Sequence, residues 1–328
     1  MSFPGSPAIS DIVATTIESR TGKIADSVSK NNAILMKLKQ GGRIQTFSGG
    51  SIITHELSFA ANGNAGFYSG YDLLPVAGQD VISWASYDIK QAACPVVISG
   101  LEQLQNNGKE AIIDLMDGRL QVAEDSMANL ISMGLYSDGT GSGGKTITGL
   151  EAAVPPGTST ARIATGTYGG IDRSAWAFWQ PFYVKDATQS TTTLPPAMNA
   201  LYANLVRGAD RPDLIVCDNL FWEAYVATLQ AQQRFMQAET GELGFANLLY
   251  MNVPVVLDGG IGGFAAPSTA YFLNTKYLKY RPHADRQFVP LSPNKRYAIN
   301  QDAEVQIIGW AGNLTCGGQL FQGRLGAT

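Results

Sequence analysis

One stretch of the sequence has the spacing of a nucleotide-binding loop. Residues 139–146 read Gly-Thr-Gly-Ser-Gly-Gly-Lys-Thr and fit GxxxxGK[ST], a pattern whose backbone N–H groups and lysine hold phosphates. Such a loop needs a strand before it and a helix after it, because the helix N-terminus helps to bind the phosphates. Here a helical pattern precedes it, and Gly149, Pro155 and Pro156 leave too little room for a helix after it. We interpret residues 139–146 as a tight turn after a helix, with a nucleotide-binding protein as an alternative.

The other residues that could do chemistry are few and far apart. The three cysteines, Cys94, Cys217 and Cys316, form no CxxC pair, and the only histidines are His55 and His283. This spacing matches neither a zinc site nor a disulfide framework, and it leaves two candidates for any His-dependent catalysis. No pair of carboxylates is placed by the sequence at one site. We therefore predict no enzyme, no cofactor and no metal.

Composition points to a protein whose surface is largely covered. Of the 328 residues, 45% are hydrophobic and only 15% are charged, against about 25% charged in typical soluble domains. The net charge of −4 is unlike that of a protein whose main task is to grip nucleic-acid phosphates. No run reaches the about 20 apolar residues that cross a bilayer, and the N-terminus lacks the features of a signal peptide.

The N-terminal 40 residues read as an arm. Two short pieces have apolar residues at helical spacing, namely residues 9–17 and 33–38. Pieces this short cannot enclose a core of their own. We expect them to lie on something else.

A strand-like region comes next, with an unusually long connection inside it. Residues 51–59 and 81–90 alternate as strands do. The 20 residues between them, 60–79, include four glycines, and structureless connections of that length are rare inside compact domains. A long hairpin whose tip is ordered by a neighbouring chain would explain it, with Tyr68 and Tyr71 as interface anchors. The alternative is that both tyrosines pack on the hairpin's own base.

The longest predicted helix begins near Asn107, with Glu110 completing a capping box, and ends at Gly134. Its apolar stripe recurs every three or four residues over about 25 residues, which is about 37 Å of helix. Far longer than the average helix, it serves as a spine for the fold.

The rest of the chain reads as an α+β region with two strands after it. Helices are predicted over residues 198–208 and 219–235, and strands over residues 213–217, 253–260 and 268–280. Residues 303–325 read as two strands that turn near Gly312 or near Gly317–Gly318. Because no helix lies near them in sequence, we expect these strands to return to the long helix.

This order of elements resembles the major capsid protein of tailed bacteriophages, which has the Hong Kong 97-like fold. The resemblance spans roughly residues 40–325. The segments that carry it are packing and turn signatures, at residues 62–72, 91–102, 134–150, 166–179, 207–219, 271–283 and 300–316.

The resemblance implies a division of the chain into four parts. Residues 1–43 would be the N-terminal arm, and residues 44–96 the extended β-hairpin loop that reaches over an adjacent subunit. Residues 97–146 and 285–328 would form the peripheral domain with its spine helix, and residues 147–284 the axial domain. The candidates for inter-subunit contact are at the loop tip: Asn62, Asn64, Tyr68 and Tyr71.

The resemblance also implies a function and partners. The protein would assemble with itself as hexamers and pentamers into the icosahedral shell of a virion, in the host bacterial cytoplasm. The shell would enclose double-stranded phage DNA without sequence-specific binding. Other expected partners are a separate scaffolding protein, the portal and a possible decoration protein, with no membrane involved. An encapsulin-like shell of a bacterial nanocompartment is the alternative within the same fold.

Overall fold

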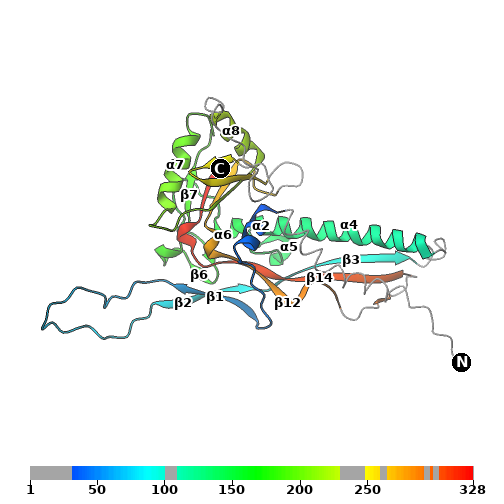
Figure 1. The fold of residues 1–328 in the computed structure, drawn as a ribbon, viewed down its shortest axis with the longest axis horizontal. Coiled ribbons are helices and arrows are strands. Elements are labelled where there is room, and N and C mark those ends of the chain that lie inside the picture. Colours follow the sequence, from blue (N-terminus) through cyan, green and yellow to red (C-terminus); the bar gives the residue numbers. More distant parts are fainter. Residues whose placement is uncertain are drawn as a thin grey trace.

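The structure is a computed structural model, and it describes residues 32–99, 109–229, 248–258, 264–291, 296–297 and 303–327. The molecule has three parts, which Figure 1 shows side by side. A sheet flanked by helices forms the upper part. A long helix beside a second sheet extends to the right of the view, and a hairpin extends to the left. The fold is α+β, as the sequence predicts.

The upper part is built on a mixed seven-stranded sheet. In spatial order its strands are β4 (Ala161–Arg162), β7 (Phe182–Lys185), β15 (Gly323–Gly326), β11 (Thr269–Leu273), β8 (Leu214–Cys217), β10 (Val253–Leu257) and β9 (Leu248–Tyr250). Helices α7 (Leu194–Leu205) and α8 (Asn219–Leu229) share a core with Ile215 and Cys217 of β8. Val216 between them faces the opposite core, so β8 is buried on both sides. The all-apolar run of β8 is explained by that burial.

The second sheet joins distant parts of the chain. β14 (Ala303–Cys316) lies in its middle, between β12 (Leu278–Pro290) and β3 (Lys90–Ser99), and the short β13 (Arg296–Tyr297) also pairs with β14. Helix α4 (Lys109–Tyr136) runs along β3 (Figure 1). Leu120, Met127 and Ile131 of α4 are buried in one core with Ile308 and Trp310 of β14. Four described members of the predicted stripe, Leu120, Ala123, Met127 and Ile131, are therefore confirmed as buried, whereas Leu130 is 40% exposed. The proposed cap Asn107 lies outside the described residues.

The hairpin and the segment before it complete the fold. Strands β1 (Ile52–Ser58) and β2 (Ile82–Asp88) are antiparallel, with Ile53 opposite Tyr87. Helix α2 (Ala33–Gln40) precedes them, and its N-cap Asn32 accepts hydrogen bonds from the backbone N–H groups of residues 34 and 35. The remaining elements are short: α5 (Gly141–Gly144), α6 (Leu150–Ala153), β5 (Thr167–Tyr168), β6 (Ile171–Asp172) and three 3₁₀ turns at Ala177–Trp179, Thr275–Tyr277 and Gln319–Phe321.

Strand pairing departs from the predicted division of the chain at three places. β3 pairs with β14 from Lys90 onward, so the second sheet begins near residue 90 and not at 97. β12 enters the same sheet at Leu278, before the predicted boundary at 284. β15 lies between β7 and β11 in the seven-stranded sheet, although residues 285–328 were expected together. Each pairing is long-range, so local periodicity carries no sign of it.

The structure also decides the roles of the glycines predicted at helix and strand ends. Gly134 lies inside α4, which continues to Tyr136. A Cβ at Gly134 would lie 2.9 Å from Ile147 Cδ1, so this glycine allows close packing and does not end the helix. Of the two turn positions predicted for the last strands, the one at Gly317–Gly318 is confirmed, because β14 runs through Gly312.

Candidate functional site

The base of the hairpin is fixed to the body of the molecule on one face. Ile53, Leu57 and Tyr87 point inward and are buried. Tyr87 Oη donates to the Cys316 carbonyl at 2.8 Å, and the Ser86 backbone N–H donates to the Gly169 carbonyl at 2.9 Å. These contacts join the hairpin to the end of β14 and to the β5–β6 turn, so they set its direction.

His55 is the central polar contact of this base. It lies between the two buried apolar residues of β1, and its Nδ1 is 3.1 Å from Thr315 Oγ1. Burial lowers the pKa of His55 to about 4, and the nearby cations Lys279 and Arg281 act in the same direction. A Cβ at Gly317 would lie 2.4 Å from His55 Nε2. The uncharged imidazole therefore fills a slot that only glycine leaves open.

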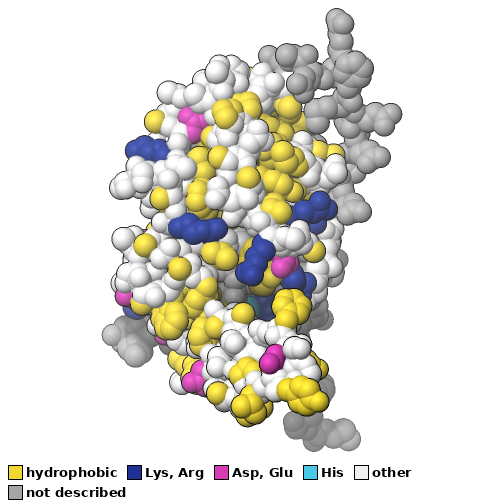
Figure 2. Space-filling model, turned by 90° about the vertical axis from the view of Figure 1, so that its left-hand side faces the viewer, with side chains coloured by type: hydrophobic (Ala, Val, Ile, Leu, Met, Phe, Trp, Pro, Cys, Tyr) yellow, Lys and Arg dark blue, Asp and Glu magenta, His cyan; other side chains and the backbone are white. Residues whose placement is uncertain are grey.

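Beyond the base, residues 60–80 form a tip that no other described part of the chain covers. Phe67, Tyr71 and Leu73 are fully exposed, and Val76 is almost so. Figure 2 looks onto the hairpin end of the molecule and shows hydrophobic side chains gathered on the hairpin at the bottom of the view. Soluble monomers rarely expose apolar side chains in such a contiguous group, and such groups mark interaction sites.

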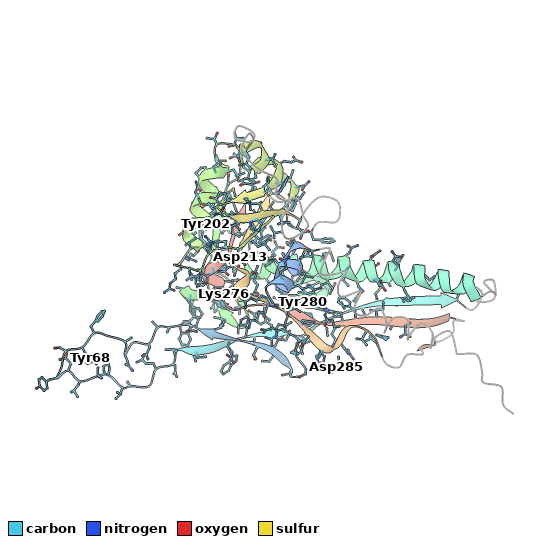
Figure 3. The ribbon with its side chains drawn as sticks, in the orientation of Figure 1. Tyr68, Tyr202, Asp213, Lys276, Tyr280 and Asp285 are labelled. Carbon is cyan, nitrogen blue, oxygen red and sulfur yellow. The ribbon has the colours of Figure 1, made fainter. Side chains whose placement is uncertain are left out.

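The four candidate contact residues all lie in this tip but differ in what they do. Asn62 Oδ1 accepts from the Asn64 backbone N–H at 2.9 Å, and Asn64 Nδ2 donates to the Ala77 carbonyl at 2.6 Å. The asparagines thus shape the tip. Tyr68 and Tyr71 project outward (Tyr68 is labelled in Figure 3), so neither packs on the hairpin's base.

Further exposed residues of the hairpin were missed by the sequence analysis. The tip also presents Phe67, Leu73 and Val76. On the outer face of the paired strands, Ile82 is 72% exposed and Trp84 is 65% exposed. The alternation along β2 could have predicted their exposure, because Ile82 and Trp84 lie on the face opposite buried Ala85 and Tyr87.

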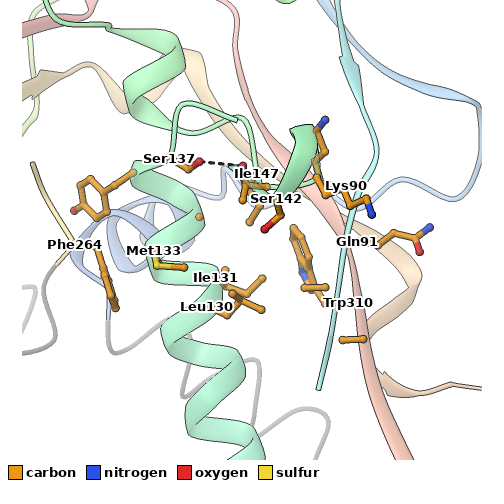
Figure 4. Close-up of a pocket in the computed structure, with 16 residues that line it drawn as sticks. Lys90, Gln91, Leu130, Ile131, Met133, Ser137, Ser142, Ile147, Phe264 and Trp310 are labelled. Atoms are coloured by element: carbon orange, nitrogen blue, oxygen red, sulfur yellow. Dashed lines mark hydrogen bonds between the residues drawn. The ribbon is translucent and has the colours of Figure 1, made fainter. Parts of the chain in front are cut away.

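A cavity lies between α4, β3 and the glycine-rich turn (Figure 4). The cavity has a volume of about 540 Å³ and is lined mainly by apolar side chains, with lysines among its other lining residues: Leu130, Ile131, Met133, Ile147, Trp310, Lys90 and Lys145. Lys90 Nζ donates to the Gly144 carbonyl at 2.7 Å. The cavity is thus a mainly apolar groove, with residues of the turn among those that line it.

The turn itself does not have the geometry of a phosphate-binding loop. Helix α4 precedes it where a strand would be needed, and Gly139, Gly143 and Gly144 have positive φ. The next helix, α6, has only four residues. In the described chain no long helix follows Lys145 directly, although such a loop requires a helix N-terminus there. The interpretation as a tight turn is supported.

The arm, the spine helix and the upper sheet meet at one half-buried carboxylate. Tyr136 Oη at the end of α4 donates to Asp258 Oδ2, and Asn32 Nδ2 lies 3.5 Å from the same oxygen. Burial raises the pKa of Asp258, and burial together with Asp258 raises the pKa of Tyr136. This hydrogen-bonded junction ties α2 to the sheet and to the helix at once.

Within the described residues there is no group of three or more His, Cys, Asp or Glu side chains that could hold a metal ion. The same residues include no helix long and apolar enough to span a membrane.

The architecture is that of Hong Kong 97-like capsid subunits. A chain of the cyanophage A-1(L) capsid asymmetric unit matches with a TM-score of 0.63 at 17% identity, covering 87% of this chain and 90% of that one. The capsid of the native GTA particle gives 0.54 at 15% identity, with coverages of 88% and 89%. The SrpI encapsulin of Synechococcus elongatus gives 0.51 at 7% identity, with coverages of 87% and 85%. No protein-family model matches the sequence, and no curated protein matches it.

Proposed function

We propose that this protein is the major subunit of an icosahedral phage head, which assembles with itself into hexamers and pentamers. The observation that supports this most is the hairpin. Its base is rigidly fixed, and its apolar tip has no partner among the described residues. A tip of this kind gains stability only by covering, or being covered by, another subunit, and many such contacts add up across a lattice.

The fold suggests a role for each part. The seven-stranded sheet with α7 and α8 corresponds to the axial domain, and α4 with the sheet of β3, β12 and β14 to the peripheral domain. Residues 1–43 act as the arm and the β1–β2 hairpin as the extended loop, with Asn62, Asn64, Tyr68 and Tyr71 at the contact. The shell encloses double-stranded DNA in the virion, is assembled in the bacterial cytoplasm and has no catalytic activity. Its other partners are a scaffolding protein, the portal and a possible decoration protein.

The encapsulin-like shell remains the second candidate, because an encapsulin shares the fold. The higher similarity to the cyanophage capsid favours the phage head. The two differ in cargo, since an encapsulin-like shell would be filled with enzyme and a phage head with DNA. Analysis of particles from infected cells separates them.

Removing the tip tests the proposal. In the test variant, residues 61–79 are replaced by Asn-Gly, which makes a two-residue turn between Ala60 and Asp80. We expect this variant to keep the melting temperature of the parent subunit but to form no shells by sedimentation and electron microscopy. A matched variant of full length, with Phe67, Tyr71 and Leu73 changed to serine, should behave the same way. Shells of normal size from the truncated chain would contradict the proposal.

A further inference from the structure

The hairpin region carries charge of only one sign. From residue 44 to residue 89 the sequence has four acidic residues, Glu56, Asp72, Asp80 and Asp88, and no lysine or arginine. In Figure 2 the hairpin accordingly shows acidic side chains among hydrophobic ones. Asp72 lies in the tip, exposed, with Oδ2 accepting from the Ser69 backbone N–H at 2.8 Å. Each tip therefore presents apolar surface together with unneutralised carboxylates.

The body of the molecule has a matching positive edge. Residues 43–47 run parallel to β12, with Ile44 beside Tyr280. Because side chains alternate along both segments, Arg43 lies on the same face as Lys279 and Arg281, opposite the core that holds Tyr280. We call these three residues, Arg43, Lys279 and Arg281, the cationic strip. Its side chains are all partly exposed.

The strip is not neutralised by the described part of its own chain. None of its three cations forms an ion pair with a described carboxylate, and Arg281 Nε is buried without a hydrogen-bond partner. Glu56 points to the face of β1 opposite His55, away from the strip. Asp285 lies past the register shift that comes after Pro282 and is exposed (Figure 3).

The hairpin of the same subunit cannot supply the missing carboxylates. Its base is held at Thr315 and Cys316, and from there it runs away from the strip. In Figure 3 Tyr68 lies at the far end of the hairpin from Tyr280. Another copy of the chain, however, brings one acidic tip for each cationic strip.

We propose that the cationic strip of one subunit receives the acidic tip, Asp72 and Asp80, of the hairpin from a neighbouring subunit. This inference rests on the proposed function, and it names the partner surface of the tip. Complementary charge steers the tip to one register, and the apolar residues beside the carboxylates then desolvate the contact. Shell assembly should therefore slow as salt rises, since exposed charges are screened within about 8 Å at physiological ionic strength.

A charge exchange in the full-length chain tests this inference. Reversing the strip with K279E/R281E, or the tip with D72K/D80K, should each lower shell yield at least tenfold, as measured by sedimentation. Combining all four substitutions should restore most of the yield, because the charges are again complementary. The control K145E/K185E reverses two exposed lysines away from the strip and should assemble like the parent. Thermal melting of each soluble subunit checks folding. If K279E/R281E misfolds, K279Q/R281Q takes its place as the strip variant.

The outcomes separate this inference from the function on which it rests. A parent chain that forms no shells overturns the proposed function and the inference with it. If the parent chain assembles but the folded variant with all four substitutions does not, the inference alone is overturned. A strip-reversed chain that assembles normally but loses double-stranded DNA in a filter-binding assay also overturns it, because the strip would then be a phosphate-binding surface.

Discussion

The two ends of the β1–β2 hairpin differ in every physical respect. At the base, inward side chains are buried, the tyrosine hydroxyl and the imidazole have partners, and glycines at 169 and 317 let the strands approach closely. At the tip, aromatic and aliphatic side chains are exposed, and the hydrogen bonds among described residues lie within the tip itself. The same two strands thus lead from a folded core to an unpartnered surface.

This difference indicates which contacts belong to the subunit and which to an assembly. The base is stable because its polar groups are satisfied by its own chain. The tip has a defined direction without buried contacts of its own, so its apolar residues contribute to stability only when another surface covers them. Changes at the base should therefore affect folding, and changes at the tip should affect assembly alone.

The largest effect on folding is expected at Gly317. Changing Gly317 to alanine places a methyl group against the His55 ring and should reduce the free energy of unfolding by about 3 kcal/mol, the upper end for overpacking. Gly78→Ala in the tip is the matched control, because a Cβ there meets nothing within 4 Å. Chemical denaturation measures both. Equal stability of the two variants would show that the base is not tightly fixed.

The second-largest effect on folding is expected from acid, which should weaken the base of the hairpin. The folded-state pKa of His55 is about 4, below the ordinary value of 6.5, so the unfolded chain binds more protons between these values. Stability contributed by the neutral imidazole is full above pH 6.5 and falls as the pH drops towards 4, by about 2 kcal/mol at pH 5. His55→Gln should remove this part of the pH dependence in denaturation curves. An unchanged pH profile in that variant would contradict the account, because it would show that His55 has the same pKa in the folded and the unfolded chain.

The smallest effect on folding is expected at the tip. Tyr71→Ser should change the free energy of unfolding by less than about 0.5 kcal/mol, because the side chain is fully exposed. Tyr87→Phe at the base removes a buried hydroxyl partner of Cys316 and should cost about 1 kcal/mol. Should Tyr71→Ser destabilise the isolated subunit as much as Tyr87→Phe, the contrast between tip and base would fail.

Elements with a strong local pattern could be predicted from the sequence. The alternation of residues 51–59 and 81–90, the stripe of the spine helix and the apolar run Leu214–Cys217 all correspond to elements of the fold. The four glycines between residues 60 and 79 indicated the long hairpin. The resemblance supplied the architecture.

The features that could not be predicted depend on contacts between distant residues. β15 pairs with both β7 and β11 in the seven-stranded sheet. Its own sequence, Gly-Arg-Leu-Gly, does not predict this pairing. His55 is an anchor of the base only because Thr315 and Gly317 meet it after folding. The cationic strip likewise combines residue 43 with residues 279 and 281.

Electron cryomicroscopy of the full-length chain, expressed alone and with a scaffolding protein, tests the central claim most directly. We expect closed icosahedral shells in which each hairpin tip lies on an adjacent subunit. A monodisperse single molecule under both conditions, with its hairpin folded against its own body, would contradict that claim.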